Sequence, residues 1–252
     1  MTITWIMQVN LGKYDNAPKD SLKKFKRAVK SFIDMKDEDT SLIIVSDGCQ
    51  IAHKTYFKEF SKIKNIKYAF VEKTTPYMYD EYNDEPLSEY HRVGTRQLGR
   101  MLVDSTLTTY LDADDVALPN HSKILALYWS SALKNNPEKL MCLNNAWYDH
   151  ETVFQFDEFK DLEAKAEESV EIEGLESKWL SVGAKPGKLS INTGLISHRS
   201  HLDITWKDND IKGLSEDTMF GNDCIAKHGA GSLFQIQTPI HVRCHNWKCW
   251  DY

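Results

Sequence analysis

The sequence predicts an α/β protein with a mostly parallel, Rossmann-like central sheet flanked by helices, and three observations lead to this prediction. Short apolar runs typical of buried strands alternate with longer segments in which apolar residues recur at helical spacing. Strands separated by helices are joined by crossover connections, which favour parallel pairing. The chain has 252 residues, of which 41% are hydrophobic and 27% charged, enough to bury one sizeable core. We therefore expect residues 1–252 to form a single compact domain.

The regular part of this pattern lies in residues 1–115. Strands are expected at residues 3–9, 42–45, 66–71 and 107–111, and helices between them at 22–33, 51–63 and 88–103. Ligands of parallel sheets bind beyond the carboxyl ends of the strands. Two acidic sites fall at that edge: Asp47 after the second strand and Asp112–Asp115 after the fourth.

The second half of the chain is less regular. We expect a helix from Asn120 to about Leu133, a strand at 140–143, a strand at 189–196 and a helix that begins at Ser215 and ends near Gly229. The acidic stretch 157–176 is consistent with a solvated helix or a mobile loop. No internal repeat or low-complexity linker divides the chain.

Charge is unevenly distributed along the sequence. Residues 1–75 carry 14 Lys and Arg against 9 Asp and Glu, whereas residues 151–176 carry 2 Lys against 10 acidic residues. The net charge of −6 therefore neither requires nor excludes a polyanionic partner. The sequence contains no apolar run long enough for a membrane span and begins without a signal-peptide pattern. Because its five cysteines also argue against a disulfide scaffold, we expect a cytoplasmic protein.

The most specific feature is the run Tyr110-Leu111-Asp112-Ala113-Asp114-Asp115, which places three carboxylates directly after a predicted strand. Like charges this close are unfavourable unless a cation neutralises them. Mg²⁺ and Mn²⁺ prefer carboxylate and water oxygens and often share them with substrate phosphates. The run therefore predicts a metal–diphosphate site, although Asp is also common in solvated turns.

The order of these features along the chain resembles that of a known family. Asp47 after a strand, Arg96-Gln97-Leu98-Gly99, the run 110–115 and Glu216-Asp217 resemble nucleotide-sugar-dependent glycosyltransferases of the GT-A fold, and most of all family 2. The resemblance implies that residues 1–115 form a nucleotide-binding half and residues 116–252 an acceptor-side half. It also implies a nucleotide-diphosphate sugar as donor, with UDP the expected nucleotide.

The resemblance assigns donor-side roles to four of these residues. Asp47 would hydrogen-bond the nucleotide base, and Asp112 the ribose or the sugar. Asp114 would bind the divalent cation, Mn²⁺ or Mg²⁺, in a DXD-type motif, with Asp115 adjacent. Arg96 lies where the family often has Arg-Asn-x-x-Gly and would contact the donor, although Gln97 here replaces the Asn.

Transfer to a hydroxyl needs a general base, which contributes about 10²–10⁴-fold to the rate. Glu216 and Asp217 are the family-like candidates, and we select Asp217 as the base of an inverting reaction. Acidic residues in the first turn of a helix are also favoured by the helix dipole alone, so a capping role is the alternative. Asn192-Thr193-Gly194 resembles the Asn-x-Gly segment near the donor sugar in retaining enzymes, which leaves the stereochemistry open. Asp223, later on the same helix, is expected to be solvated or paired.

The carboxyl-terminal region offers further metal ligands. By resemblance, His245 or His241 would complete the shell of the divalent cation. Two alternatives are a histidine in a core hydrogen-bond network and a structural zinc site, although the spacing fits no familiar zinc pattern. The zinc site would draw on Cys224, His228, His241, Cys244, His245 and Cys249.

The acceptor is not fixed by any residue. A glycan or a lipid-linked hydroxyl is preferred, and a hydroxymethylated base of viral DNA is the second option because the first third of the chain is basic. The Gln-x-x-Arg-Trp segment of processive synthases is absent, which favours transfer of a single sugar. The competing classes are a sugar-nucleotide nucleotidyltransferase, which would need more glycines than Gly12 after the first strand, and a non-catalytic nucleotide-binding or zinc-binding module.

Overall fold

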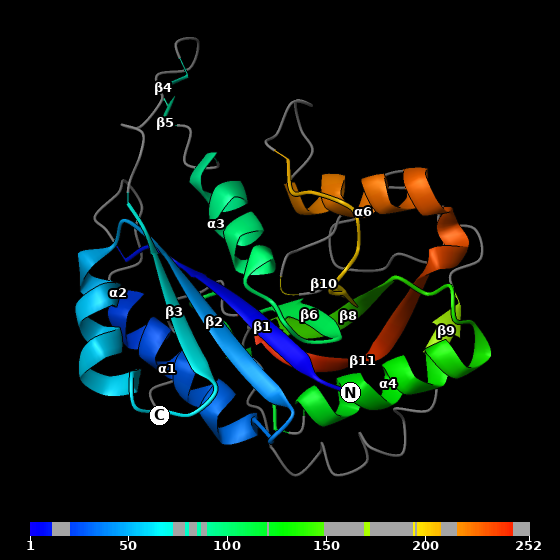
Figure 1. Ribbon diagram of the computed structural model, residues 1–252, viewed down its shortest axis with the longest axis horizontal. Coiled ribbons are helices and arrows are strands. Elements are labelled where there is room, and N and C mark those ends of the chain that lie inside the picture. Colours follow the sequence, from blue (N-terminus) through cyan, green and yellow to red (C-terminus); the bar gives the residue numbers. More distant parts are fainter. Residues whose placement is uncertain are drawn as a thin grey trace.

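The computed structural model describes residues 1–11, 21–72, 79–80, 85–86, 90–119, 121–148, 169–171, 194, 196–207 and 216–243. Within these residues, nine strands form one twisted sheet, and a separate pair of short strands lies apart from it (Figure 1). Strands from both halves of the chain belong to the one sheet. The predicted α/β fold is therefore confirmed.

The first half of the chain supplies these elements: β1 (Ile3–Val9), α1 (Ser21–Met35), β2 (Thr40–Asp47), α2 (Gln50–Thr55), the π-helical turn η1 (Tyr56–Phe60), β3 (Ile66–Val71), β4 (Tyr79–Asp80), β5 (Glu85–Pro86), α3 (Tyr90–Met101) and β6 (Leu107–Tyr110). The second half supplies β7 (Val116–Ala117), α4 (His121–Asn135), β8 (Met141–Tyr148), β9 (Ser169–Glu171), β10 (Ile196–Arg199), α6 (Glu216–His228), the 3₁₀ turn η4 (Ala230–Ser232) and β11 (Leu233–Arg243).

The sheet is mixed, and its larger parallel part comes from the first half of the chain. The strand order is β3-β2-β1-β6-β10-β8-β11-β7, with β9 also paired to β11. The strands β3, β2, β1 and β6 are parallel neighbours, and β8 pairs in parallel with β11. The strand β10 is antiparallel to both β6 and β8 and so joins the two halves. The carboxyl ends of β1, β2, β3 and β6 therefore meet at one edge of the sheet.

Both faces of the sheet are covered by helices. Helices α1, α2 and α4 lie on one side of it and α3 and α6 on the other (Figure 1). Side chains of β1 alternate accordingly, because Trp5 and Met7 belong to the core under α1 and α4, whereas Ile6 belongs to the core under α3 and α6. Strands buried on both faces read as continuous apolar runs, which is why the first strands could be found in the sequence.

Helix α3 approaches the sheet closely at a glycine. A Cβ atom placed on Gly99 would lie 2.6 Å from Cγ2 of Ile6 in β1 and 3.3 Å from Cγ2 of Val45 in β2. Only a residue without a side chain allows this approach. Gly99 therefore sets the height of α3 above the strands, and with it the position of Arg96 one turn earlier.

Most predicted elements are present, with shifted ends, but within the acidic stretch 157–176, expected as a helix or a loop, Ser169–Glu171 form strand β9. The first and third strands match the predicted ranges, and the helix expected at 51–63 is α2 followed by η1. Of the strand expected at 189–196, Gly194 lies in a 3₁₀ turn and Ile196 begins β10 (Ile196–Arg199), whereas residues 189–193 and 195 lie outside the described residues. Strand β11 was not predicted, because Pro239 lies in its middle and cannot donate to a ladder. The register of β11 against β8 shifts on both sides of Pro239.

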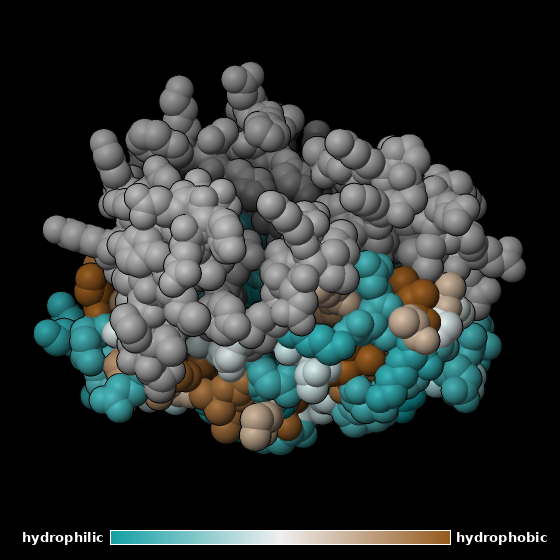
Figure 2. Space-filling model, turned by 90° about the horizontal axis from the view of Figure 1, so that it is seen from above, coloured by the Kyte–Doolittle hydropathy of each residue, from teal (hydrophilic) through white to brown (hydrophobic). Residues whose placement is uncertain are grey.

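The described surface seen from above is mostly hydrophilic, with apolar residues in separate spots (Figure 2). Within the described ranges, no helix is long and apolar enough to cross a membrane.

Candidate active site

The site predicted from the sequence is built at the carboxyl edge of the parallel strands. Asp47 is the last residue of β2, and its side chain is buried. Gly48 follows with φ 59°, and its N–H donates to the carbonyl oxygen of Val71 at 2.8 Å. This left-handed turn ends the strand and keeps Asp47 at the edge of the sheet.

The acidic run forms a turn directly after β6. The backbone N–H of Asp115 donates to the carbonyl oxygen of Asp112 at 3.1 Å, and Asp115 is buried whereas Asp112 and Asp114 are half-buried. Arg27 of α1 donates from Nη2 to the carbonyl oxygen of Asp114 at 2.9 Å. The guanidinium group of Arg27, on helix α1, thus fixes the backbone of the turn. The sequence did not reveal this contact.

The donor atoms of this turn suit a hard divalent cation. Among the residues with described placement, no three His, Cys, Asp or Glu side chains are grouped closely enough to hold a metal ion by themselves. Mg²⁺ is held in many nucleotide enzymes by one or two carboxylates, with substrate phosphates and water filling the other positions. Asp112 and Asp114, neither of them fully buried, fit a site of that kind.

Arg96 of α3 joins the amino end of α6. Its Nη1 donates to Oε1 of Glu216 at 2.8 Å and to Oδ1 of Asp217 at 3.1 Å. All three side chains are buried, with 6%, 5% and 10% of their surface exposed. The two carboxylates that the sequence singled out are therefore held by one guanidinium group that lies 120 residues before Glu216 in the chain.

Asp112 belongs to the same electrostatic environment. Burial lowers the pKa of the Arg96 guanidinium, but the negative charges of Asp217, Asp112 and Glu216 outweigh burial, and the net effect raises it. Arg96 is thus a permanent cation among three carboxylates. Arg96, Glu216 and Asp217 thus come together in the structure, and the charge of Asp112 also acts on Arg96.

A stack of aromatic rings supports this cluster. The guanidinium carbon of Arg96 lies 4.9 Å from the centre of the Trp206 ring, and Trp206 stacks on Phe220 of α6 at 4.3 Å and 12°. The backbone N–H of Trp206 donates to Oε1 of Gln97 at 3.4 Å. One turn later, Arg100 lies over the Phe220 ring and donates to carbonyl oxygens of the 202–206 segment. Helix α3 therefore holds both that segment and α6.

A buried hydrogen-bond chain continues from Trp206 into the sheet. Its Nε1–H donates to the hydroxyl oxygen of Tyr110 at 3.0 Å, and that hydroxyl is 3.0 Å from Nε2 of His198. Nδ1 of His198 lies 2.8 Å from the carbonyl oxygen of Arg199, so Nδ1 carries the proton and Nε2 accepts. Burial is the main cause that lowers the pKa of His198 to about 3 and raises that of Tyr110 to about 12. Both groups are therefore neutral at physiological pH, and none of this chain was anticipated from the sequence.

Several predicted residues fall outside the described residues, including Asn192 and His245. The backbone of His241 pairs with Ala117 in β7, two residues beyond Asp115, so β11 runs beside the acidic turn. Of the alternative zinc ligands, His228 pairs through Nε2 with Asp203 at 2.8 Å, and the Cys224 thiol is buried 3.8 Å from the Ser232 hydroxyl. Burial also raises the pKa of that thiol to about 11.

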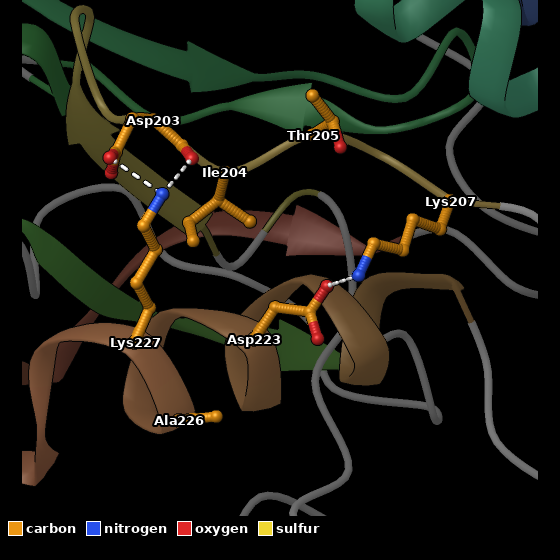
Figure 3. Close-up of a pocket in the computed structure, with 7 residues that line it drawn as sticks. All are labelled: Asp203, Ile204, Thr205, Lys207, Asp223, Ala226 and Lys227. Carbon is orange, nitrogen blue, oxygen red and sulfur yellow. Dashed lines mark hydrogen bonds and ion pairs between the residues drawn. The ribbon is translucent and has the colours of Figure 1, made fainter.

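An open pocket of about 350 Å³ lies beside α6, and none of the predicted site residues lines it (Figure 3). Two ion pairs cross it: Lys207 to Asp223 at 2.7 Å and Lys227 to Asp203 at 2.7 Å. Asp223 is thus paired, one of the two states expected for it.

The comparisons with known proteins add a structural match. No protein-family model and no curated protein matches the chain. The crystal structure of S. aureus TarS 1–349 superposes with a TM-score of 0.61 at 12% sequence identity, over 97% of this chain and 60% of that one. The complex of TarS 1–349 with UDP-GlcNAc matches with a TM-score of 0.61 at 11% identity, over 98% and 59% of the two chains. The fold that the two proteins share is of the GT-A type.

The chain has the GT-A fold. This confirms the fold that the resemblance implied. A further S. aureus TarS structure matches with a TM-score of 0.58 at 14% identity, over 97% of this chain and 37% of that one. The chain thus spans 60% or less of the TarS chains it matches.

Proposed function

We propose that the protein is a glycosyltransferase that moves one sugar from a nucleotide-diphosphate sugar to an acceptor hydroxyl. The observation that carries this proposal is the buried cluster in which Arg96 joins Glu216 and Asp217 close to Asp112. The cluster lies on a GT-A fold, and it includes the end of the strand where such a fold binds its ligand.

The donor is proposed to be a UDP-linked sugar. Asp47 ends β2, and Asp112 follows the end of β6 by two residues, on the two strands that flank β1; there they would hydrogen-bond the base and the ribose or sugar. S. aureus TarS has been crystallised with UDP and with UDP-GlcNAc, which supports this nucleotide and makes UDP-GlcNAc the first sugar to test.

A divalent cation, Mn²⁺ or Mg²⁺, is proposed to be held by Asp114, with Asp115 and a late histidine adjacent. When bound, the cation supplies positive charge that stabilises the leaving diphosphate. Arg27 contributes by holding the Asp114 backbone in place.

Asp217 is proposed to be the general base, with Glu216 beside it. The acceptor oxygen forms a bond to the anomeric carbon of the sugar, and its proton passes to the Asp217 carboxylate. The bond from that carbon to the diphosphate oxygen breaks, and the nucleoside diphosphate leaves with the electron pair. Direct attack by the acceptor inverts the anomeric centre. The acceptor is proposed to be a glycan or a lipid-linked hydroxyl, with a hydroxymethylated DNA base as the second choice.

Calorimetric titration of UDP into the protein tests this proposal. Binding is expected with Mn²⁺ and is expected to disappear with EDTA, because the diphosphate and Asp114 would share the cation. If UDP and the other nucleoside diphosphates do not bind under either condition, the proposed function is wrong.

The variant Asp114→Asn tests, in the same titration, whether Asp114 holds the cation. Loss of one charged ligand should weaken Mn²⁺-dependent UDP binding by at least about 10–100-fold, by analogy with losses at metal sites. Asp104→Asn is the matched control, because Asp104 is exposed and paired with Lys67 at 3.1 Å. Equal UDP affinity of the two variants would rule out Asp114 as the metal ligand.

A further inference from the structure

We propose that Arg96 is a positioning residue for the general base, rather than a donor ligand: it holds Asp217 ionised and oriented beside Glu216. This inference rests on the proposed function. It also differs from the donor contact that the family resemblance implies for Arg96.

The contact geometry supports a role at the carboxylates. A single nitrogen, Nη1, reaches both Glu216 at 2.8 Å and Asp217 at 3.1 Å. Hydrogen bonds between ionised groups at these distances are strong and directional. A carboxylate offers about four acceptor positions, and the bond from Arg96 uses one of those of Asp217. Arg96 thereby sets the orientation of the carboxylate without occupying all of its oxygen lone pairs.

The positive charge of Arg96 affects whether Asp217 carries a proton. Two adjacent carboxylates in a buried site cannot both remain ionised without a cation, and one of them otherwise takes up a proton. Among the described residues, the cation that pairs with the Asp217 carboxylate is Arg96 from α3, at 3.1 Å, and Glu216, Tyr110 and Asp112 are coupled to this pair. Arg100, one turn later on α3, also acts electrostatically on Tyr110. An Asp217 that had taken up a proton could not accept another from the acceptor.

The surroundings of Arg96 keep it in this position. Trp206 covers one face of the guanidinium and is itself held by Phe220, by Gln97 and by the Tyr110 hydroxyl. Moving the guanidinium to a donor would break two buried ion pairs, and a buried charge left without its partner costs several kcal/mol. Trp206 thus holds the Arg96 guanidinium in place, and Arg96 in turn orients the Asp217 carboxylate.

The test compares Arg96→Gln and Arg96→Lys with Arg100→Gln. Arg100 lies one turn away on α3 and also stacks on this aromatic pair, but its hydrogen bonds go to carbonyl oxygens of Leu202 and Ile204. Arg100→Gln therefore reports the effect of losing a half-buried arginine from α3 without touching the carboxylates. Three quantities are measured for each variant: the pH dependence of kcat with a UDP-sugar, the Kd of UDP with Mn²⁺, and the carboxyl ¹³C titration of Asp217.

In Arg96→Gln the acid limb of the pH profile of kcat should shift to higher pH by about 1–3 units. An adjacent arginine usually lowers the pKa of an aspartate by this amount, and the variant loses that effect. The UDP Kd should change less than about threefold, since the donor contact is not made by Arg96. Arg96→Lys, which keeps the charge, should restore the wild-type limb at least in part. Arg100→Gln should lower Tm and leave the acid limb unchanged.

Two results would overturn the inference. One is an unchanged acid limb in Arg96→Gln, and the other is a loss of UDP affinity as large as the loss in kcat/KM. If the wild-type protein transfers no sugar at all, the proposed function fails, and the ¹³C titration alone decides the inference. The Asp217 carboxyl must then titrate at higher pH in Arg96→Gln than in the wild type.

Discussion

At the scale of single residues, the site joins side chains that are far apart in the sequence. Arg96 and Asp217 are 121 positions apart, yet their side chains share a buried hydrogen bond. Position directly after a strand pointed to Asp47 and Asp112, whereas the family resemblance pointed to Glu216 and Asp217. The sequence pattern could not pair Arg96 with them, because helical periodicity shows which face is buried but not what it meets.

Asp217→Asn tests the role of the base directly. The amide cannot accept the proton of the acceptor, so kcat should fall by about 10²–10⁴-fold. The Kd of UDP with Mn²⁺ should remain within about threefold, because the donor contacts lie at the strand ends. Steady-state kinetics and calorimetry on one preparation measure both quantities.

Asp223→Asn is the control, since Asp223 lies on the same helix and is paired with Lys207 at the surface. It should retain wild-type kcat. If Asp217→Asn keeps its kcat and only lowers Tm, then Asp217 is a helix cap and not the base.

At the scale of elements, helix α3 carries the site and its seating on the sheet can be tested. A Cβ at Gly99 would meet Ile6, a core residue, whereas a Cβ at Gly94 of the same helix would meet no atom within 4 Å. Gly99→Ala should therefore lower the free energy of unfolding by about 1–3 kcal/mol through overpacking. Gly94→Ala should raise it by about 0.5–1 kcal/mol, because alanine is the better helix former.

Urea unfolding of the two variants measures both changes in the free energy of unfolding. An unchanged m-value would show that the folded state keeps its compactness. A Gly99→Ala protein as stable as Gly94→Ala would show that α3 does not depend on the close approach.

The hydrogen-bond chain between β6, β10 and the 202–206 segment predicts a pH dependence. The pKa of His198 is lowered to about 3 in the folded protein, whereas an unfolded histidine titrates near 6.5. As pH falls from 6.5 towards 3, the unfolded state binds a proton that the folded state does not, so the free energy of unfolding decreases. The decrease is at most about 2.7 kcal/mol between pH 6.5 and 4.5, and it stops below pH 3.

His198→Gln lacks this group and should lose less stability than the wild type over the same pH interval, although it is less stable at pH 7. Equal pH-dependent losses in wild type and His198→Gln, measured by urea unfolding at pH 6.5 and 4.5, would contradict the buried neutral histidine.

Elements were easier to predict in the first half of the chain than in the second, for a physical reason. Parallel strands buried on both faces give unbroken apolar runs, and β1 and β3 were found at their observed ends. Strand β11 pairs with β7, β8 and β9, but Pro239 divides it at a change of register. A proline inside a run of residues is a poor strand signal, so the pattern alone did not reveal β11.

At the scale of the whole molecule, the two halves share one sheet and the core on each of its faces. Strand β10 of the second half pairs directly with β6 of the first, and the larger core cluster contains Trp5 together with Trp129 and Phe234. The candidate site is also built from both halves, because α3 and β6 come from the first half and α6 from the second. Neither half can bury its side of the sheet, or complete the site, without the other.

We therefore expect one unfolding transition for the chain, with coincident midpoints by far-ultraviolet circular dichroism and by tryptophan fluorescence. Ligand binding to a shared site should stabilise the whole unit. At UDP and Mn²⁺ concentrations about 100 times the Kd, both midpoints should rise together by the equivalent of about 2.7 kcal/mol. Two separate transitions, with only one of them shifted by UDP, would instead show that residues 1–115 and 116–252 fold and bind as independent units.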